Sequence, residues 1–409
     1  MERILLLVPA TSYRVKDFLT AAHRSGAEVT VGSNVEVVFN AFESASHLPL
    51  PFDDLPSCVE IIATFHETHP LVAIIGVDEP TALLAAEASK QLGLTHNPPD
   101  SVAITGNKLR LRETLSAARL PSPSFTRISS EGALSTALPV IDFPCVIKPV
   151  GEAASRGVIR ANDEAELRAA YDRLQTMLPG GDVIVEDFLP GKEVALEGLM
   201  VDGRLITLAL FDKPDPLDGP YFEETIYVTP SQQEADIQDS LHRMTQEAAA
   251  ALGLTDGPIH AELRLREGEA ASNQQGPWII EIAARSIGGL CSRSLSFDNG
   301  TSLEEIIVSH ALGAEVSAPS PDAEASGVMM IPVPAAGVLR RIDGDIDARA
   351  VDHITNLEFS IRPGQEVVPL PEGNQYLGFI FARGPDPATV EEALRKAHAF
   401  LRFEIEPLA

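Results

Sequence analysis

Trp278-Ile-Ile-Glu281-Ile-Ala-Ala-Arg285 is the most informative segment of the chain, because it places a carboxylate inside an otherwise apolar strand. The segment His260-Ala-Glu262-Leu-Arg264-Leu265 does the same. Two buried carboxylates on neighbouring strands repel each other unless a positive charge lies between them. Mg²⁺ prefers carboxylate oxygens together with substrate phosphates, so it fits such a pair. The residues alone leave a second interpretation open, in which Glu281 forms a structural ion pair with Arg264 or Arg285.

A glycine-bearing loop follows an earlier apolar strand, in Lys148-Pro-Val-Gly151-Glu-Ala-Ala-Ser155-Arg-Gly157. Such a loop lets backbone N–H groups approach phosphate oxygens, and the lysine adds a positive charge. The Walker A pattern is absent from it. Taken alone, the segment is also typical of a hairpin without a ligand.

A third segment, Glu186-Asp-Phe-Leu-Pro-Gly-Lys-Glu193, combines a strand end, a turn and a second carboxylate. Its backbone fits the edge of an adenine, and the Glu193 carboxylate can accept hydrogen bonds from ribose hydroxyl groups. A plain acidic turn explains the same residues, so this segment also needs its context.

The composition narrows the class of protein. The chain has 409 residues, which at roughly 100–200 residues per domain indicates about two to four domains. Its net charge of −28 disfavours binding to nucleic acid or to an anionic membrane. The 3 cysteines lie far apart without a CxxC pair, which fits a reducing compartment, so we expect a cytoplasmic protein. No apolar run approaches the roughly 18 residues of a membrane span.

The order of elements indicates an α/β fold. Short apolar strands at 4–8 and 71–75, separated by helical segments, predict a parallel sheet covered on both faces. Ligands bind beyond the carboxyl ends of such strands, where Asp78 and Glu79 lie, although both residues could instead cap the next helix. Residues 193–211 alternate like antiparallel strands with a turn at Asp202-Gly203. We expect domains at 1–118, 119–187 and 188–409, with 327–409 as a terminal subdomain.

Taken together and in this order, the segments are far more specific than any one of them. Lys108, the Lys148 loop, Glu186…Glu193 and Glu262…Glu281-x-x-x-Arg285 resemble the ATP-grasp superfamily over essentially the whole chain. The chain is most similar to the carboxylate–amine ligases that join two L-amino acids, the L-amino acid ligase type. The resemblance implies an ATP-grasp fold of α/β (α+β) class, in which 119–187 is a small mobile lid and 188–409 is an antiparallel catalytic domain.

The resemblance also implies roles for individual residues. ATP would lie between the lid and the catalytic domain, with Mg²⁺ or Mn²⁺ as two ions. The implied nucleotide contacts are Lys108 and Lys148 on the phosphates, Gly151, Ser155 and Gly157 in the loop over them, Glu186, Asp187, Phe188 and Leu189 around the adenine, and Glu193 on the ribose. Glu262 and Glu281 would hold the metal. Ala283 takes a position where many members have a metal-binding Asn, which favours the dipeptide-forming members.

The implied reaction runs through an acyl phosphate, which is formed from a substrate carboxylate and ATP and is then attacked by an amine. Arg285 would stabilise the tetrahedral oxyanion, with help from the loop N–H groups of Gly288 and Gly289. Glu224 is the candidate for the α-amino group of the carboxyl-donating amino acid. The adjacent Glu223 is the alternative, because the register of that segment is uncertain.

Two other functions compete with a dipeptide-forming ligase. One is another ATP-grasp ligase or carboxylase acting in intermediary or nucleotide metabolism. The other is a non-catalytic ATP-binding regulator, which would have little need of Arg285. The expected partners are small-molecule L-amino acids, with neither nucleic acid nor membrane. Relatives of this kind are often homodimers, although no segment here demonstrates an interface.

Overall fold

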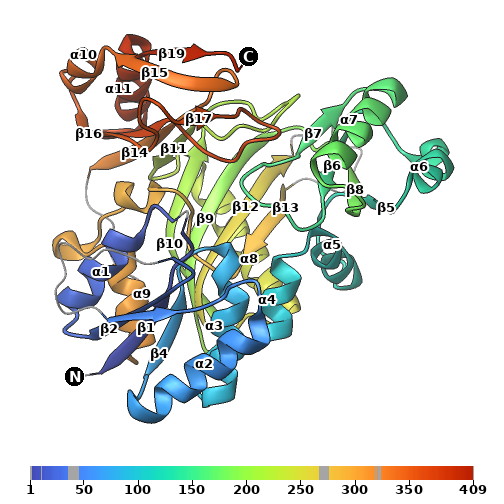
Figure 1. Cartoon of the computed structure of the whole chain (residues 1–409). Helices are drawn as coiled ribbons and strands as arrows, with labels where there is room; N and C mark the ends of the chain where they lie inside the picture. The colour runs from blue at the N-terminus through green and yellow to red at the C-terminus, as the bar shows by residue number, and fades with distance from the viewer. Residues whose placement is uncertain are drawn as a thin grey trace.

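The N-terminal part of the chain is a parallel sheet with helices on both faces. The structure is a computed structural model that describes residues 2–10, 12–35, 46–266, 276–317, 320 and 324–408. The strands β1 (Arg3–Leu7), β2 (Glu28–Ser33), β3 (Ser46–Pro49) and β4 (Ala73–Gly76) lie in the order β3-β2-β1-β4. The helices that follow them are α1 (Val15–Arg24), α2 (Leu55–Thr68) and α3 (Glu79–Leu92), seen in Figure 1. The predicted parallel sheet is confirmed.

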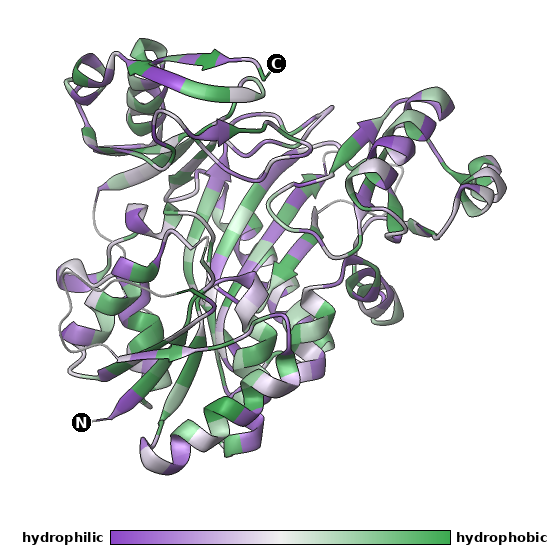
Figure 2. Ribbon diagram, in the orientation of Figure 1, coloured by the Kyte–Doolittle hydropathy of each residue, from purple (hydrophilic) through white to green (hydrophobic). Residues whose placement is uncertain are grey.

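The continuously apolar sequence of β1 follows from its position between two layers. Ile4 and Leu6 pack into a core with α1, whereas Leu5 and Leu7 pack on the opposite face with residues of α2 and α3. Successive side chains of a strand point to opposite faces, so a strand covered on both sides must be apolar throughout. Within this sheet, β1 and β4 are mainly green in the hydropathy colouring of Figure 2.

The carboxyl end of β4 leads directly into α3. Asp78 is the N-cap residue of this helix, and its backbone N–H lies 3.5 Å from the Thr81 hydroxyl. The helix ends at Leu92 and is followed by its C-cap residue Gly93, which has a left-handed φ of 68°. The next helices are α4 (Pro99–Thr105) and α5 (Lys108–Ala117). Asp78 therefore caps α3 and also lies at the sheet edge where ligands bind in such folds.

A small antiparallel sheet follows, and we call it, with its helices, the lid (Phe125–Asp187). Its strands are β5 (Phe125–Ile128), β6 (Cys145–Pro149), β7 (Ile159–Ala161) and β8 (Val183–Asp187), in the order β5-β8-β6-β7. The helices α6 (Glu131–Ala137) and α7 (Glu164–Met177) belong to the same unit. It has a core of its own, which includes Ile147 and Leu167, and it projects to the right in Figure 1.

The largest sheet has 8 strands, and all its pairs are antiparallel. In sheet order they are β13 (Gly276–Ala283), β12 (Gly257–Arg266), β9 (Lys192–Val201), β10 (Arg204–Lys213), β11 (Ile226–Thr229), β14 (Ala325–Ile331), β18 (Gly378–Gly384) and β16 (Ile354–Phe359). The helices α8 (Ala235–Leu252) and α9 (Leu303–Ala311) lie beside this sheet. The turn between β9 and β10 falls at Asp202-Gly203, as predicted.

The C-terminal part adds a further sheet and helices. The strands β15 (Gly337–Asp343), β17 (Glu366–Val367) and β19 (Arg402–Glu406) form it, in the order β17-β15-β19. The helices here are α10 (Asp345–Arg349) and α11 (Pro387–Phe400). Across the described part of the chain, no helix has both the length and the apolar character that crossing a membrane requires.

Candidate active site

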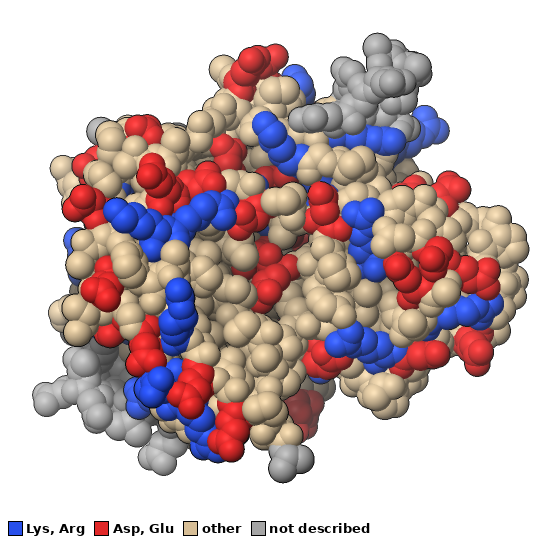
Figure 3. Space-filling model, turned by 90° about the horizontal axis from the view of Figure 1, so that it is seen from above, with Lys and Arg blue, Asp and Glu red and all other residues tan. Residues whose placement is uncertain are grey.

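A cavity of about 800 Å³ is lined by residues from the N-terminal sheet region, the lid and the large sheet. Glu79 follows β4, Lys148 lies at the end of β6, and Glu262 and Glu281 lie on β12 and β13. Figure 3 shows acidic side chains inside a hollow near the middle of one face of the molecule. Segments far apart in the sequence therefore meet at one site.

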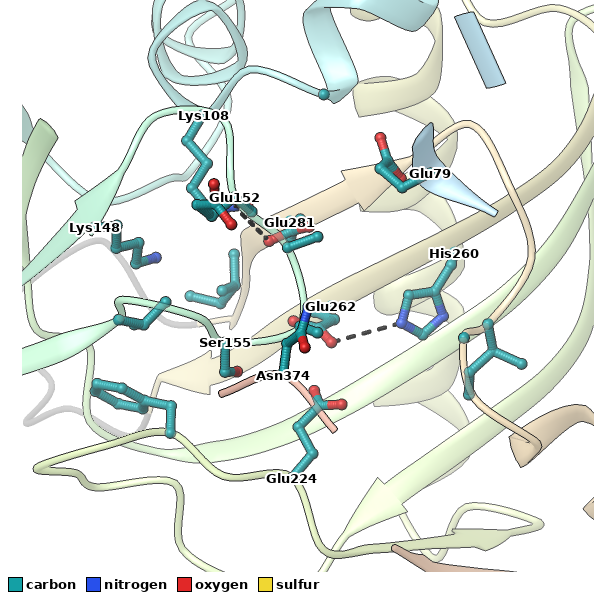
Figure 4. A pocket seen from close by; sticks show the side chains of 18 of the residues that line it. Glu79, Lys108, Lys148, Glu152, Ser155, Glu224, His260, Glu262, Glu281 and Asn374 are labelled. Atoms are coloured by element: carbon teal, nitrogen blue, oxygen red, sulfur yellow. Dashed lines mark hydrogen bonds and ion pairs between the residues drawn. The ribbon is translucent and has the colours of Figure 1, made fainter. Parts of the chain in front are cut away.

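Most of the residues that the sequence predicted for the site line this cavity. They are Lys108, Lys148, Gly151, Ser155, Glu186, Asp187, Phe188, Leu189, Glu193, Glu224, Glu262, Glu281, Arg285, Gly288 and Gly289. Figure 4 shows several of them around the same space. Gly157 and Glu223 are not among the lining residues. Gly157 instead packs against Pro149, and its N–H donates to the carbonyl of Pro371 over 2.8 Å.

The two carboxylates of the predicted metal pair lie opposite each other. Glu262 and Glu281 are register partners on β12 and β13. Their side chains retain 18% and 29% of their exposure, so they are less buried than the apolar strands suggested. The Lys108 ammonium lies 3.6 Å from a Glu281 oxygen. The alternative structural ion pairs for Glu281 do not form, because Arg264 binds Glu193 and Arg285 binds Glu79.

Glu186 holds the lysine of the glycine-bearing loop in place. Its carboxylate lies 2.6 Å from the Lys148 ammonium and 2.7 Å from Arg112 Nε. Burial would raise the pKa of Glu186, but the charges of Arg112 and Lys148 lower it to about 2. The side chain therefore stays ionised and fixes Lys148 at the cavity wall, while the backbone that follows it lines the cavity.

Lys213 is a site residue that the sequence reasoning did not identify. Its ammonium lies 2.8 Å from Glu193, 2.7 Å from Glu224 and 3.1 Å from Glu262. Burial alone would lower the pKa of Lys213, but the three carboxylates raise it well above its usual value. The visible signal was a lysine at the end of the apolar strand 204–213, which must find a partner when it is buried.

The same contacts decide which carboxylates suit a metal ion. Oxygens of Glu193, Glu224 and Glu262 lie within 4.8 Å of one another. The Lys213 ammonium lies among these carboxylates, so a metal ion bound by all three would have to displace a buried positive charge. Glu262 and Glu281 are instead register partners on the adjacent strands β12 and β13, and they offer the oxygen donors that Mg²⁺ prefers. The side chain of Ala283, two residues after Glu281, offers no oxygen donor. The Glu262–Glu281 pair therefore fits a metal ion better than the group around Lys213 does.

His260 links a buried carboxylate to the metal-ligand candidate. Its Nδ1 lies 2.5 Å from Glu197, which is fully buried, and its Nε2 lies 3.5 Å from Glu262. Burial would lower the pKa of His260, but the Glu197 charge raises it to about 9. The imidazole is therefore a second fixed cation beside Glu262, and neither His260 nor Glu197 was predicted as a site residue.

Arg285 is held at the cavity wall by the N-terminal part of the chain. Its Nε donates to Glu79 over 2.9 Å. Burial would lower the pKa of Arg285, but the charges of Glu79 and Glu281 raise it. Gly288 and Gly289 follow in the same cavity wall, and Gly289 has a left-handed φ of 60°. Arg285 and the Gly288-Gly289 backbone thus line the same cavity, and an oxyanion needs a cation and amide donors of this kind.

Two parts of the cavity wall differ in character. Phe188, Leu189 and Phe222 form an apolar surface near the lid, with the two phenyl rings 6.4 Å apart. Near Glu224 the wall contains Tyr227, Tyr376, Met330 and Cys291. The first surface suits a flat aromatic base, and the second suits an apolar side chain.

Comparison with known proteins places this geometry in a family. Residues 141–294 match a model of the ATP-grasp domain, and residues 19–96 match the ATP-grasp N-terminal domain. Residues 329–406 match the L-amino acid ligase C-terminal domain 2. The chain therefore belongs to the ATP-grasp superfamily, whose members are ATP-dependent ligases that form carbon–nitrogen bonds. The predicted superfamily and fold class are confirmed.

The individual proteins that resemble this chain share only about a quarter of their residues with it. An L-amino acid ligase from Bacillus licheniformis has a similar structure, with a TM-score of 0.83 and 24% identity over 99% of both chains. An uncharacterized protein of Sinorhizobium fredii is 22% identical over 100% of this chain and 84% of its own length. The alanine–anticapsin ligase of Bacillus subtilis is 26% identical over 50% of this chain, and the match spans 46% of that protein.

Proposed function

We propose that this protein is an L-amino acid ligase. It joins the carboxylate of one L-amino acid to the amine of another and produces a dipeptide, ADP and phosphate. The match of residues 329–406 to an L-amino acid ligase domain supports this choice over other reactions of the superfamily. The observation that carries it is the presence of Glu224, Arg285 and the phosphate-binding candidates in one cavity.

Glu224 is suited to hold the α-ammonium group of the carboxyl-donating amino acid. Its side chain retains 22% of its exposure, and Figure 4 shows it directed into the cavity. Burial raises the pKa of Glu224 to about 7, against the lowering effect of Lys213. An incoming ammonium ion would favour the ionised form, so substrate binding and ionisation of this carboxylate support each other.

The first chemical step forms the acyl phosphate. An oxygen of the substrate carboxylate attacks the γ-phosphorus of ATP, the bond to the bridging oxygen breaks, and ADP leaves. Lys108 and Lys148 offset the charge on the phosphates. Mg²⁺ held by Glu262 and Glu281 would supply further charge stabilisation to the phosphoryl oxygens.

The second step forms the amide bond. The amine nitrogen of the second amino acid attacks the acyl carbon, and the amine loses its proton. Arg285 and the amides near Gly288 and Gly289 stabilise the tetrahedral oxyanion, and phosphate then leaves. The lid covers the cavity and keeps water from the acyl phosphate, which would otherwise be hydrolysed.

The test is ADP and phosphate release with Mg²⁺–ATP against L-amino acids, offered singly and in pairs, with mass spectrometry of the products. We expect release to require two amino acids and a dipeptide mass to appear. Release stimulated by bicarbonate or by another carboxylic acid, with no active amino acid pair, would refute the proposal and favour the carboxylase-type alternative.

A matched pair of variants tests the role of Glu224. We expect Glu224→Gln to raise the KM of the carboxyl-donating amino acid by roughly tenfold or more, because a charged hydrogen bond is lost. Glu223→Gln is the control, since Glu223 does not line the cavity. Equal effects of the two variants would contradict the assignment of Glu224.

A further inference from the structure

A loop of the C-terminal part holds the lid against the rest of the molecule. The loop lies between β17 and β18, at residues 368–377, and we call it the clasp. The carbonyl of Pro371 accepts from the N–H of Gly157 over 2.8 Å, and the carbonyl of Glu372 accepts from Arg156 Nε over 3.0 Å. Both donors belong to the loop that begins at Lys148. The clasp is therefore hydrogen-bonded to the segment that is proposed to cover the phosphates.

The Glu372 side chain adds a second attachment to the lid. Its two oxygens accept from Nε and Nη2 of Arg173 over 2.5 Å and 2.9 Å. Arg173 lies on α7, the helix that packs on the lid sheet, and it also donates to the Tyr221 hydroxyl. A two-pronged contact of this kind fixes direction as well as distance. The clasp therefore contacts a helix of the lid as well as its loop.

The other end of the clasp lines the cavity. Asn374, Gln375 and Tyr376 are cavity residues, and Figure 4 shows Asn374 between Ser155 and Glu224. One residue, Gly373, thus separates the lid contact at Glu372 from the wall at Asn374, beside the proposed amino acid site. A bound ligand that orders this part of the cavity wall would therefore also order the clasp, which contacts the lid.

The clasp is a tightly packed turn with hydrogen bonds both within it and to neighbouring segments, so a shift at one end should move the other. The N–H of Gly373 donates to Pro369 over 2.8 Å, and a Cβ at Gly373 would lie 1.8 Å from the Val368 carbonyl oxygen. Ser360 donates to the Tyr376 carbonyl over 2.6 Å, and the N–H of Leu377 donates to Ile331 over 2.9 Å. The turn is therefore tightly folded and anchored to the large sheet.

We propose that Glu372 is a positioning residue that couples occupation of the amino acid site to engagement of the lid over the nucleotide. It touches no reacting atom, and it acts through Arg173 and the clasp. The inference rests on the proposed function in one respect, that phosphates lie beneath the loop at residues 151–157. Linkage then makes the coupling reciprocal, so nucleotide binding also orders the wall at Asn374.

The expected effect is modest, because the pair is partly exposed to water. The side chains of Arg173 and Glu372 retain 40% and 36% of their exposure. Exposed ion pairs contribute little, so Glu372→Gln should shift the lid equilibrium by roughly two- to fivefold. Glu372→Arg should shift it further, since it places two like charges together, and Arg173→Glu should do the same.

The first test measures hydrogen exchange in residues 151–158 with Mg²⁺ and a non-hydrolysable ATP analogue. We expect the analogue to protect this segment in the wild type and to protect it less in Glu372→Arg and in Arg173→Glu. The combined charge swap should recover much of that protection. Glu406→Gln is the control, because it removes another exposed Arg–Glu pair, with Arg340, away from the lid. Unchanged protection in both single variants would overturn the proposal.

The second test measures the dipeptide formed per ADP released. We expect a lower ratio in Glu372→Arg, since a loosely held lid lets water reach the acyl phosphate, and recovery in the charge swap. An unchanged ratio would overturn the coupling. If no amino acid pair is active in the wild type, the proposed function fails, but the exchange experiment still decides whether the clasp holds the lid.

Discussion

Glu186 shows how one buried charge ties stability to the nucleotide site. Only 2% of it is exposed, and Arg112 and Lys148 both bind its carboxylate. Burial opposes ionisation, but the two cations prevail and lower its pKa from 4.5 to about 2. A lowered pKa in the folded protein means that the contribution to stability is complete above pH 4.5 and is lost as the pH falls toward 2.

We predict that Glu186→Gln lowers the free energy of unfolding by on the order of 3 kcal/mol near neutral pH, because two buried cations lose their partner. The difference from wild type should shrink by about 1.4 kcal/mol at about pH 3.5, where the unfolded chain has gained a proton that the folded protein has not. Urea unfolding at both pH values measures this. The control is Glu164→Gln, which changes an exposed carboxylate. A difference that does not vary with pH would contradict the prediction.

Arg285 tests the proposed chemistry at a single residue. Arg285→Lys keeps the charge but loses the planar array of donors. We expect amino-acid-dependent ADP release to fall by roughly 10²- to 10³-fold, because stabilisation of the oxyanion is lost. The affinity for a non-hydrolysable ATP analogue should change by less than about threefold, since the loss concerns the transition state.

Steady-state kinetics and a binding titration separate these two effects. Arg349→Lys provides the control, because Arg349 is an exposed arginine that lies 4.0 Å from Asp345. An equal loss of nucleotide affinity and of turnover in Arg285→Lys would show that Arg285 acts in binding rather than in catalysis.

The site residues that were predicted and those that were missed differ in what fixes their position. Glu262 and Glu281 were visible because each interrupts an apolar strand. Lys213 became a site residue through sheet register, since β10 places it opposite Glu193. On the other side of Glu193, β12 places Arg264. A single sequence without a partner strand does not reveal such neighbours.

At the scale of elements, the same distinction holds. The strand β1 was predicted because both of its faces are buried, so its own residues carry the pattern. The strand β3 has no such run, and it forms by pairing with β2. Short strands such as β17 depend in the same way on a neighbour. Local sequence therefore predicted the elements that bury their own surface, and tertiary pairing decided the rest.

Alanine substitutions at two glycines of the lid distinguish the cost of backbone strain from the cost of steric crowding. Gly157 and Gly180 have the same φ of 74°. A Cβ at Gly157 would lie 2.6 Å from Pro149 Cγ, whereas a Cβ at Gly180 would meet nothing within 4 Å. We predict that Gly180→Ala lowers the free energy of unfolding by about 1 kcal/mol through strain alone. Gly157→Ala should cost about 1–3 kcal/mol more through overpacking.

Urea unfolding of the two variants gives this comparison directly. We also expect Gly157→Ala to raise the KM for ATP, because the loop that begins at Lys148 would shift from the cavity. Gly180→Ala should leave that KM unchanged. Equal stability losses would show that crowding at Gly157 is relieved at little cost, and that this loop adapts more easily than its contacts indicate.

At the scale of the whole molecule, many carboxylates lie around the cavity, and basic side chains form ion pairs with them. Its net charge is −28, yet the carboxylates around the cavity are balanced by lysine, arginine and histidine from different elements. Each of these contacts joins segments that are far apart in the sequence. The site is therefore also a junction between the N-terminal part, the lid and the large sheet, and a ligand bound there should stabilise all three together.

We predict that a non-hydrolysable ATP analogue with Mg²⁺ raises the free energy of unfolding by about 2.7 kcal/mol at about a hundredfold excess over its Kd. Chelation of the metal should remove most of this gain, because the phosphates would then face Glu262 and Glu281 without a cation between them. A variant with both residues changed to glutamine should lose the metal dependence but keep part of the nucleotide effect, since Lys108 and Lys148 remain. If chelation has no effect on the wild type, the pair does not hold a metal, and the lysines alone account for phosphate binding.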